Sequence, residues 1–168
     1  MIRRLHHALD VVVLTIAVPM TVVMLACTVW QVVSRYFLGI STSFTDELAR
    51  FLFIWVSLLG AAYVFGKRGH IAITGLIEFL PAGVRRITDT ATALLVVIFS
   101  AVILGGGGFI LVGKAVQLGQ VSPAMLLPIG YVYSVIPVSG AVTAMYALLV
   151  VAELWTGQET KSTGVSLD

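Results

Sequence analysis

The sequence predicts an all-α integral membrane protein with four transmembrane helices, both chain ends in the cytoplasm, and a short interfacial helix between spans two and three. Two features of its composition indicate this class: 59% of the 168 residues are apolar and only 11% are charged. Ordinary soluble domains contain about 25% charged residues, so these side chains cannot cover a water-facing surface. A soluble enzyme, a disordered chain and a nucleic-acid-binding protein are therefore disfavoured, and no nucleic acid is expected as a partner.

Three of the four spans follow from long uncharged segments. A spanning helix needs about 20 mostly apolar residues. Segments of this kind lie at residues 11–34, 90–113 and 129–152. The last one begins after Pro128, because prolines interrupt helices, and Pro137 within it predicts a kink.

The second span has to begin among charged residues. Its uncharged part, 51–66, is ~24 Å long as a helix, which is shorter than the ~30 Å hydrocarbon layer. Ser43 is followed three residues later by Asp46, a pattern that resembles a helix-capping box. A helix over 44–66 would cross the layer, and Asp46, Glu47 and Arg50 would then lie in its first two turns at the membrane boundary.

The basic residues predict the orientation. With both ends in the cytoplasm, seven of the ten Lys and Arg residues face inward, as short cytoplasmic loops prefer. Four of these are expected near the lipid headgroups: Lys67, Arg68, Arg85 and Arg86. Residues 71–80 are apolar but too short to span, which favours an interfacial helix. We expect one membrane domain over 1–155 and a polar tail over 156–168.

The sequence offers little for catalysis or for binding a cofactor. His6, His7 and His70 lie outside the expected spans, and no two of them have the i, i+4 spacing of a helical metal site. Neither a metal nor a cofactor nor a catalytic residue is therefore expected. The middle of each expected span has no carboxylate, which argues against a transporter that couples ions on its own. The run Gly105–Gly108 indicates either close helix packing or a bendable point.

Two polar faces remain without an assigned role. The first lies on span one and covers about 80° of the helix; it holds Thr21, Thr28, Gln31 and Arg35. It indicates either packing within this bundle or contact with another membrane protein. On span two, Glu47 and Arg50 are one turn apart, and Asp46 is also one turn from Arg50. Glu47 and Arg50 form either a solvated pair worth at most about 1 kcal/mol or a buried pair against a neighbour.

Several short motifs, in order, resemble one family. The sequence contains Gln31-Val-Val-Ser-Arg35, then Thr45-Asp-Glu-Leu-Ala-Arg50-Phe-Leu-Phe-Ile-Trp55, then Lys67-Arg-Gly-His-Ile71, and Ile136-Pro-Val-Ser-Gly140 in the last span. This arrangement resembles the small membrane subunit of TRAP (tripartite ATP-independent periplasmic) transporters, the DctQ-like family. The resemblance extends over roughly residues 31–140.

The resemblance implies a scaffold in a bacterial inner membrane and not an enzyme. A large DctM-like membrane subunit would carry substrate and sodium, and a periplasmic binding protein would deliver a carboxylate-bearing organic acid, such as a C4-dicarboxylate, sialic acid or another sugar acid. Six residues are expected to contact the partner subunit: Gln31, Arg35, Asp46, Glu47, Arg50 and Trp55. Two alternatives remain, a free-standing membrane scaffold or assembly factor, and a small transporter that forms homo-oligomers.

Overall fold

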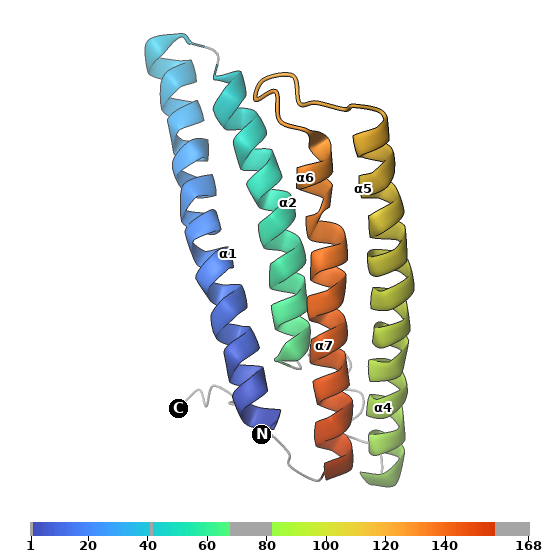
Figure 1. The fold of residues 1–168 in the computed structure, drawn as a ribbon. Helices are drawn as coiled ribbons and strands as arrows, with labels where there is room; N and C mark the ends of the chain where they lie inside the picture. The colour runs from blue at the N-terminus through green and yellow to red at the C-terminus, as the bar shows by residue number, and fades with distance from the viewer. Residues whose placement is uncertain (1, 41, 68–81, 157–168) are drawn as a thin grey trace, which may run out of the picture.

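The computed structural model describes residues 2–40, 42–67 and 82–156, and these residues form four long helical rods (Figure 1). The first rod is α1 (Ile2–Val33) with the π-helical turn η1 (Ser34–Leu38), and the second is α2 (Ser43–Gly66). The third joins α4 (Ala82–Phe99), the π-helical η2 (Ser100–Gly107) and α5 (Gly108–Gln117). The fourth joins α6 (Ile129–Tyr133) and α7 (Val135–Thr156).

Each of the four rods is long and apolar enough to cross a membrane. The spanning stretches are Arg4–Leu38, Ser43–Gly66, Ile87–Gln117 and Ile129–Trp155. The expected all-α fold with four spanning helices is confirmed. The expected interfacial helix at 71–80 and the tail beyond residue 156 lie outside the described residues.

The rods are arranged as an open row rather than as a closed bundle. α1 packs on α2, α2 packs on α7, and α7 packs on the rod formed by α4, η2 and α5 (Figure 1). α1 also touches α7. Buried residues make up 44% of the most apolar window of the last span, but only 11–17% of the other three. α7 therefore forms the centre of the row, and the other helices have wide exposed faces.

One end of the row holds the start of α1 and the ends of α2 and α7, and we call it the terminal end. The opposite end, the loop end, holds the α1–α2 turn and residues 118–128, which connect α5 to α6 (Figure 1). The buried apolar core is formed by Val13, Leu59, Val135 and Tyr146, one or more from each of α1, α2 and α7. The core thus joins three helices.

A regular pattern of less exposed residues shows how α1 meets its neighbours. Apart from Leu9 and Met20, which lie beside them, these residues recur every three or four positions: His6, Asp10, Val13, Ala17, Thr21, Met24, Cys27, Gln31 and Ser34. This is the spacing of one helix face. Thr21 and Gln31 therefore belong to packing within the chain, whereas Thr28 and Arg35 are exposed. The polar face expected on span one therefore has two parts: one packs within this chain, and the other is exposed, as contact with another membrane protein would require.

Glycines allow the third and fourth rods to approach closely. A Cβ atom at Gly108 would lie 2.8 Å from Pro137 Cδ, and one at Gly140 would lie 2.7 Å from Leu104 Cβ. A Cβ atom at Gly107 would meet nothing within 4 Å. Close packing thus explains only part of the glycine run. The last rod is interrupted at Ser134, between α6 and α7, as Pro137 predicts, because its ring disfavours the helical bond one turn earlier.

Candidate functional site

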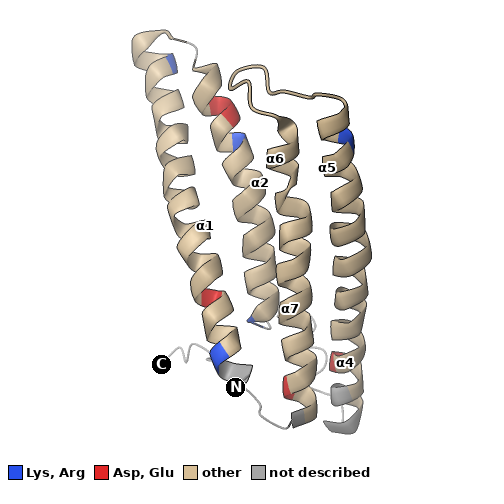
Figure 2. Ribbon diagram, viewed as in Figure 1, with Lys and Arg blue, Asp and Glu red and all other residues tan. Residues whose placement is uncertain are grey.

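The described charged residues gather toward the two ends of the row, and the middle of each rod contains none (Figure 2). At the loop end they include Arg35, Asp46, Glu47 and Arg50. At the terminal end they include Asp10, Lys67 and Glu153. These two polar clusters are the candidate functional sites.

At the loop end, one carboxylate oxygen of Glu47 holds the connection between α5 and α6. Glu47 Oε2 accepts a hydrogen bond from the Ser122 hydroxyl at 3.0 Å and from the backbone N–H groups of Ala124 and Met125, both at 2.9 Å. Ser122 is fully buried. Hydrogen bonds to a charged acceptor are the stronger kind, so α2 fixes a loop that lies more than 70 residues away in sequence.

The loop between α5 and α6 forms a turn whose backbone N–H groups can bind a carboxylate. Leu126 N–H donates to the Ser122 carbonyl, and Ser122 N–H donates to the Leu127 carbonyl. These bonds close a tight turn, and the N–H groups at its start point together, which is how backbone turns bind anions. Leu126 has a φ of 55°, an unusual conformation for a bulky residue, and its side chain is exposed.

Arg50 pairs with a different acidic residue from the one expected. Its Nη2 lies 3.3 Å from Asp46 Oδ2, and both side chains are exposed, by 70% and 60%. Glu47 points to the loop instead, so the expected Glu47–Arg50 pair is wrong. The physical reason is that Asp46 is also one turn from Arg50, whereas the loop offers Glu47 three donors.

The other three expected contact residues have different environments. Arg35 is exposed in η1. Gln31 is half-buried, and its Nε2 atom is buried without a hydrogen-bond partner. Trp55 is half-buried and packs against the core. The structure thus separates residues that face outward from residues that shape the inside of the row.

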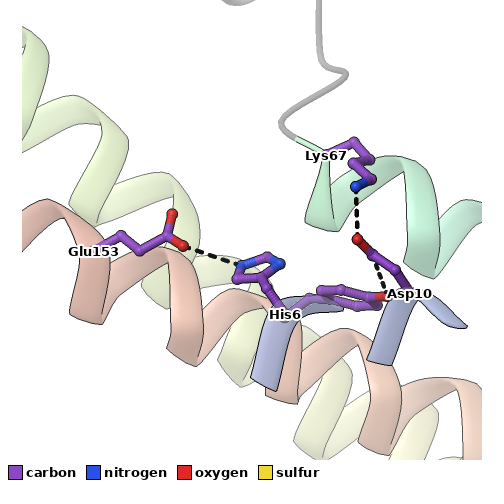
Figure 3. A network of polar contacts seen from close by, with 5 residues as sticks. His6, Asp10, Lys67 and Glu153 are labelled. Carbon is purple, nitrogen blue, oxygen red and sulfur yellow. Dashed lines mark hydrogen bonds and ion pairs between the residues drawn. The ribbon is translucent and has the colours of Figure 1, made fainter. Parts of the chain in front are cut away.

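At the terminal end, Asp10 joins three helices (Figure 3). Its Oδ2 lies 2.6 Å from Nζ of Lys67, the residue after α2, and its Oδ1 accepts a hydrogen bond from the Tyr146 hydroxyl of α7 at 2.9 Å. Asp10 is buried, whereas half of the Lys67 side chain is exposed. The hydrogen bond from Lys67 to Asp10 raises the pKa of Lys67, and burial acts in the opposite direction.

Two further contacts complete this cluster. His6 Nε2 lies 3.6 Å from Glu153 Oε1 on α7, and the rings of His6 and Tyr146 are 5.6 Å apart (Figure 3). The Lys67 ammonium also lies 5.5 Å from the centre of the Tyr63 ring. Among the described residues, no group of three or more His, Cys, Asp and Glu side chains is placed to hold a metal ion. The cluster is suited to holding helices together.

Comparison with known proteins identifies the family. Residues 24–157 match the family described as tripartite ATP-independent periplasmic transporters, DctQ component. The match includes most of the chain. The chain belongs to the DctQ family. The resemblance inferred from the sequence is thereby confirmed, and the protein is a multi-pass membrane component of a transporter.

Individual relatives agree with this assignment. A Haemophilus influenzae protein, provisionally named a TRAP transporter small permease protein, is 27% identical over 140 residues, which cover 83% of this chain and 85% of the relative. The sialic acid TRAP transporter small permease protein SiaQ of Vibrio cholerae is 30% identical over 107 residues, 62% of this chain and 60% of the relative.

A third relative is much longer. The isethionate TRAP transporter permease protein DctMQ of Oleidesulfovibrio alaskensis is 30% identical over 104 residues, which are 62% of this chain but only 16% of that protein. In DctMQ, a segment similar to this DctQ-family chain is therefore part of a larger permease polypeptide. DctQ-family subunits work with a large membrane permease.

The terminal cluster of this DctQ-family chain was not predicted from the sequence. His6 was expected outside the first span, the first span was expected to begin one residue after Asp10, and the last span to end one residue before Glu153. The available signal was that His6 and Asp10 are one turn apart on the face that continues to Val13. Their partners on α2 and α7 could not be inferred without the arrangement of the helices.

The four basic residues expected near the headgroups have different positions. Lys67 makes the ion pair with Asp10. Arg68 lies outside the described residues. Arg85 and Arg86 belong to α4, and their side chains lie outside the described part of the chain. Of these four residues, the structure therefore gives a partner only to Lys67.

Proposed function

We propose that this chain is the small scaffold subunit of a sodium-coupled TRAP importer for an organic acid in a bacterial inner membrane. It would act together with a large DctM-like permease and a periplasmic binding protein. The observation that carries the proposal is the DctQ-family match over residues 24–157. The open row of helices supports it, because an open row offers wide faces to a larger membrane protein.

A supporting role is favoured over transport by this chain alone. The described charged residues lie toward the ends of the row (Figure 2), and the central carboxylates of the two clusters, Glu47 and Asp10, have partners within the chain. Transporters that couple ions usually have ionisable groups or broken helices near the middle of the membrane. We infer that sodium and substrate are bound by the large permease. The small subunit would then be neither an enzyme nor a carrier.

We propose that the terminal end is cytoplasmic and that residues 1–155 form one membrane domain. Short cytoplasmic loops collect Lys and Arg residues, and the four basic residues from Lys67 to Arg86 then lie on that side. Arg35, Asp46 and Arg50 would be near the periplasmic boundary, where their exposed side chains could reach a partner. Gln31, Glu47 and Trp55 would support the same interface indirectly, by shaping α1, α2 and the loop.

The substrate class stays open within this proposal. Two of the relatives are named for sialic acid and for isethionate, so the anionic group of the cargo could be a carboxylate or a sulfonate. The small subunit need not touch the cargo. A C4-dicarboxylate, sialic acid and another sugar acid are the first compounds to assay.

Co-purification tests the proposed function. The tagged chain is extracted from its native membrane in mild detergent, and the recovered proteins are identified by mass. We expect a large multi-span permease in near-equal amount. Recovery of this chain alone would favour a free-standing scaffold, recovery as a homo-oligomer would favour a small transporter, and either result would contradict the proposal.

A further inference from the structure

We propose that the outward face of α2 is the surface on which the large permease packs, whereas the outward faces of α1 and of the α4–η2–α5 rod face lipid. The proposal rests on the proposed function and assigns its interface. From Asp46 onward, the exposed residues of α2 recur every three or four positions and form one stripe, which we call the α2 stripe: Asp46, Arg50, Phe53, Ser57, Ala61 and Val64.

The depth of the α2 stripe makes lipid a poor neighbour for it. α2 has 24 residues and is ~36 Å long, so that centring it across a ~30 Å hydrocarbon layer places Arg50 ~8 Å inside the boundary. Ser57 then lies ~4 Å from the midplane. Charged and polar side chains at such depths normally face protein or a water-filled cavity.

The polar groups of the α2 stripe also have unused hydrogen-bonding capacity. The guanidinium of Arg50 makes one contact, to Asp46 at 3.3 Å, although it carries five donor N–H groups. Among the described residues, the Ser57 hydroxyl has no hydrogen-bond partner, whereas Thr21 and Thr28 each donate to a carbonyl one turn earlier. Ser57 and Arg50 can therefore both bind a group from another helix.

The other exposed faces have no charged residue near the middle of the membrane, and large apolar side chains predominate there. Exceptions include Ala101, Gly106 and Gly107 on η2 and Thr28 on α1, whose hydroxyl already donates to the Met24 carbonyl. On α4 and η2, the outward residues near the middle of the rod include Leu95, Ile98 and Val102. On α1 they include Val22 and Val29. Large apolar side chains suit lipid tails, whereas interfaces between membrane helices favour small and hydrogen-bonding residues. The contrast assigns the α2 stripe to a protein neighbour.

The chemistry of that neighbour follows from the stripe. It is a transmembrane helix of the large permease that carries an acidic or amide side chain opposite Arg50 and a hydrogen-bonding group opposite Ser57. Charge complementarity selects this occupant over a second copy of the chain. The stripe of a second copy would offer Arg50 one carboxylate, that of Asp46, which already has an ion pair with its own Arg50. The fused relative, in which a similar segment belongs to a larger permease, favours the same partner.

Site-directed photocrosslinking tests the assignment. Cys27, the single cysteine, is replaced by alanine, and one new cysteine is introduced at a time. Ser57→Cys and Ala61→Cys report on the α2 stripe, whereas Ile98→Cys and Val102→Cys report on the α4–η2 face at comparable depth. Each variant is labelled with benzophenone maleimide in membranes that also contain the large permease, and then irradiated.

We expect a covalent adduct with the large permease from both α2 positions and several-fold less from both control positions. Adducts from Ile98→Cys or Val102→Cys that equal or exceed those from α2 would overturn the assignment. A homodimer adduct from α2 would also overturn it. A control without irradiation separates the two proposals. If the unmodified chain does not recover the large permease on purification, the proposed function itself is contradicted, and not only the assignment of the α2 stripe.

A second pair of variants measures the contact without a label. Ser57→Leu is acceptable to lipid but obstructs a packed helix, whereas Val102→Leu changes the size of a lipid-facing side chain. We expect Ser57→Leu to lower the permease recovered per inserted chain several-fold, and Val102→Leu to leave it unchanged. Equal recovery in both variants would contradict the assignment.

Discussion

At the scale of single residues, the carboxylate of Glu47 makes more hydrogen bonds than the charged groups of the residues beside it, Asp46 and Arg50. It accepts three hydrogen bonds from the loop at residues 118–128, whereas the adjacent Asp46 makes one exposed ion pair. Two acidic residues that are adjacent in sequence therefore have different functions. One builds the loop end, and the other belongs to the α2 stripe.

This difference predicts unequal effects on stability. Glu47→Ala leaves three donors without their acceptor, and we expect the free energy of unfolding to fall by roughly 3 kcal/mol. Asp46→Ala is the matched control, with an expected loss under about 1 kcal/mol. Denaturant unfolding in detergent measures both values, and limited proteolysis reports on the loop. Similar losses in the two variants would show that the loop does not depend on Glu47.

A second prediction at this scale concerns Gly66. A Cβ atom there would overlap the ring of Tyr146, which is fully buried. Gly66→Ala therefore forces the ring away from Asp10, and we expect a loss of about 1–3 kcal/mol, as in other overpacked cores. Gly60→Ala, on the same helix with nothing within 4 Å, should be neutral or slightly stabilising. The melting temperatures of the two variants in detergent check this, and equal values would contradict it.

At the scale of helices, the terminal cluster holds α1 against α2 and α7. Because the pKa of Lys67 is raised in the folded chain, its pair with Asp10 contributes stability below the ordinary pKa of lysine. That contribution is lost as the pH rises through the folded value. The Lys67–Asp10 pair should thus be insensitive to pH in the neutral range.

The corresponding test compares wild type with Lys67→Gln. We expect the variant to be less stable by about 1–2 kcal/mol. This margin should be constant from about pH 6 to 9 and should close only as the pH rises past the raised pKa of Lys67. Lys114→Gln removes the same charge from an exposed site at the loop end and serves as the control. A margin that changes between pH 6 and 9, or an equal effect of the control, would rule out this role for the pair.

The helices could be predicted from the sequence, whereas their contacts could not. Uncharged segments and the need to cross ~30 Å located the four rods, and Pro137 located the interruption of the last one. The helical repeat placed Glu47 and Arg50 on one face, but the choice between Asp46 and Glu47 as the partner of Arg50 depended on a distant loop. Likewise, Asp10 gains its function only when α2 and α7 bring Lys67 and Tyr146 beside it.

At the scale of the whole molecule, orientation is the first property to test. With the terminal end in the cytoplasm, seven of the ten basic residues face inward. Reporter fusions after Asp168 should therefore give a cytoplasmic signal, and fusions near Lys114 a periplasmic one. A periplasmic signal from the C-terminus would contradict the proposed orientation.

Uptake into proteoliposomes tests the central claim most directly, because it asks whether this chain is a necessary partner rather than a carrier. The large permease and the binding protein are reconstituted with and without this chain, and uptake of candidate organic acids is followed under a sodium gradient. We predict uptake only when all three components are present, and none with this chain alone. Uptake by this chain alone, or full uptake when it is omitted, would contradict the account.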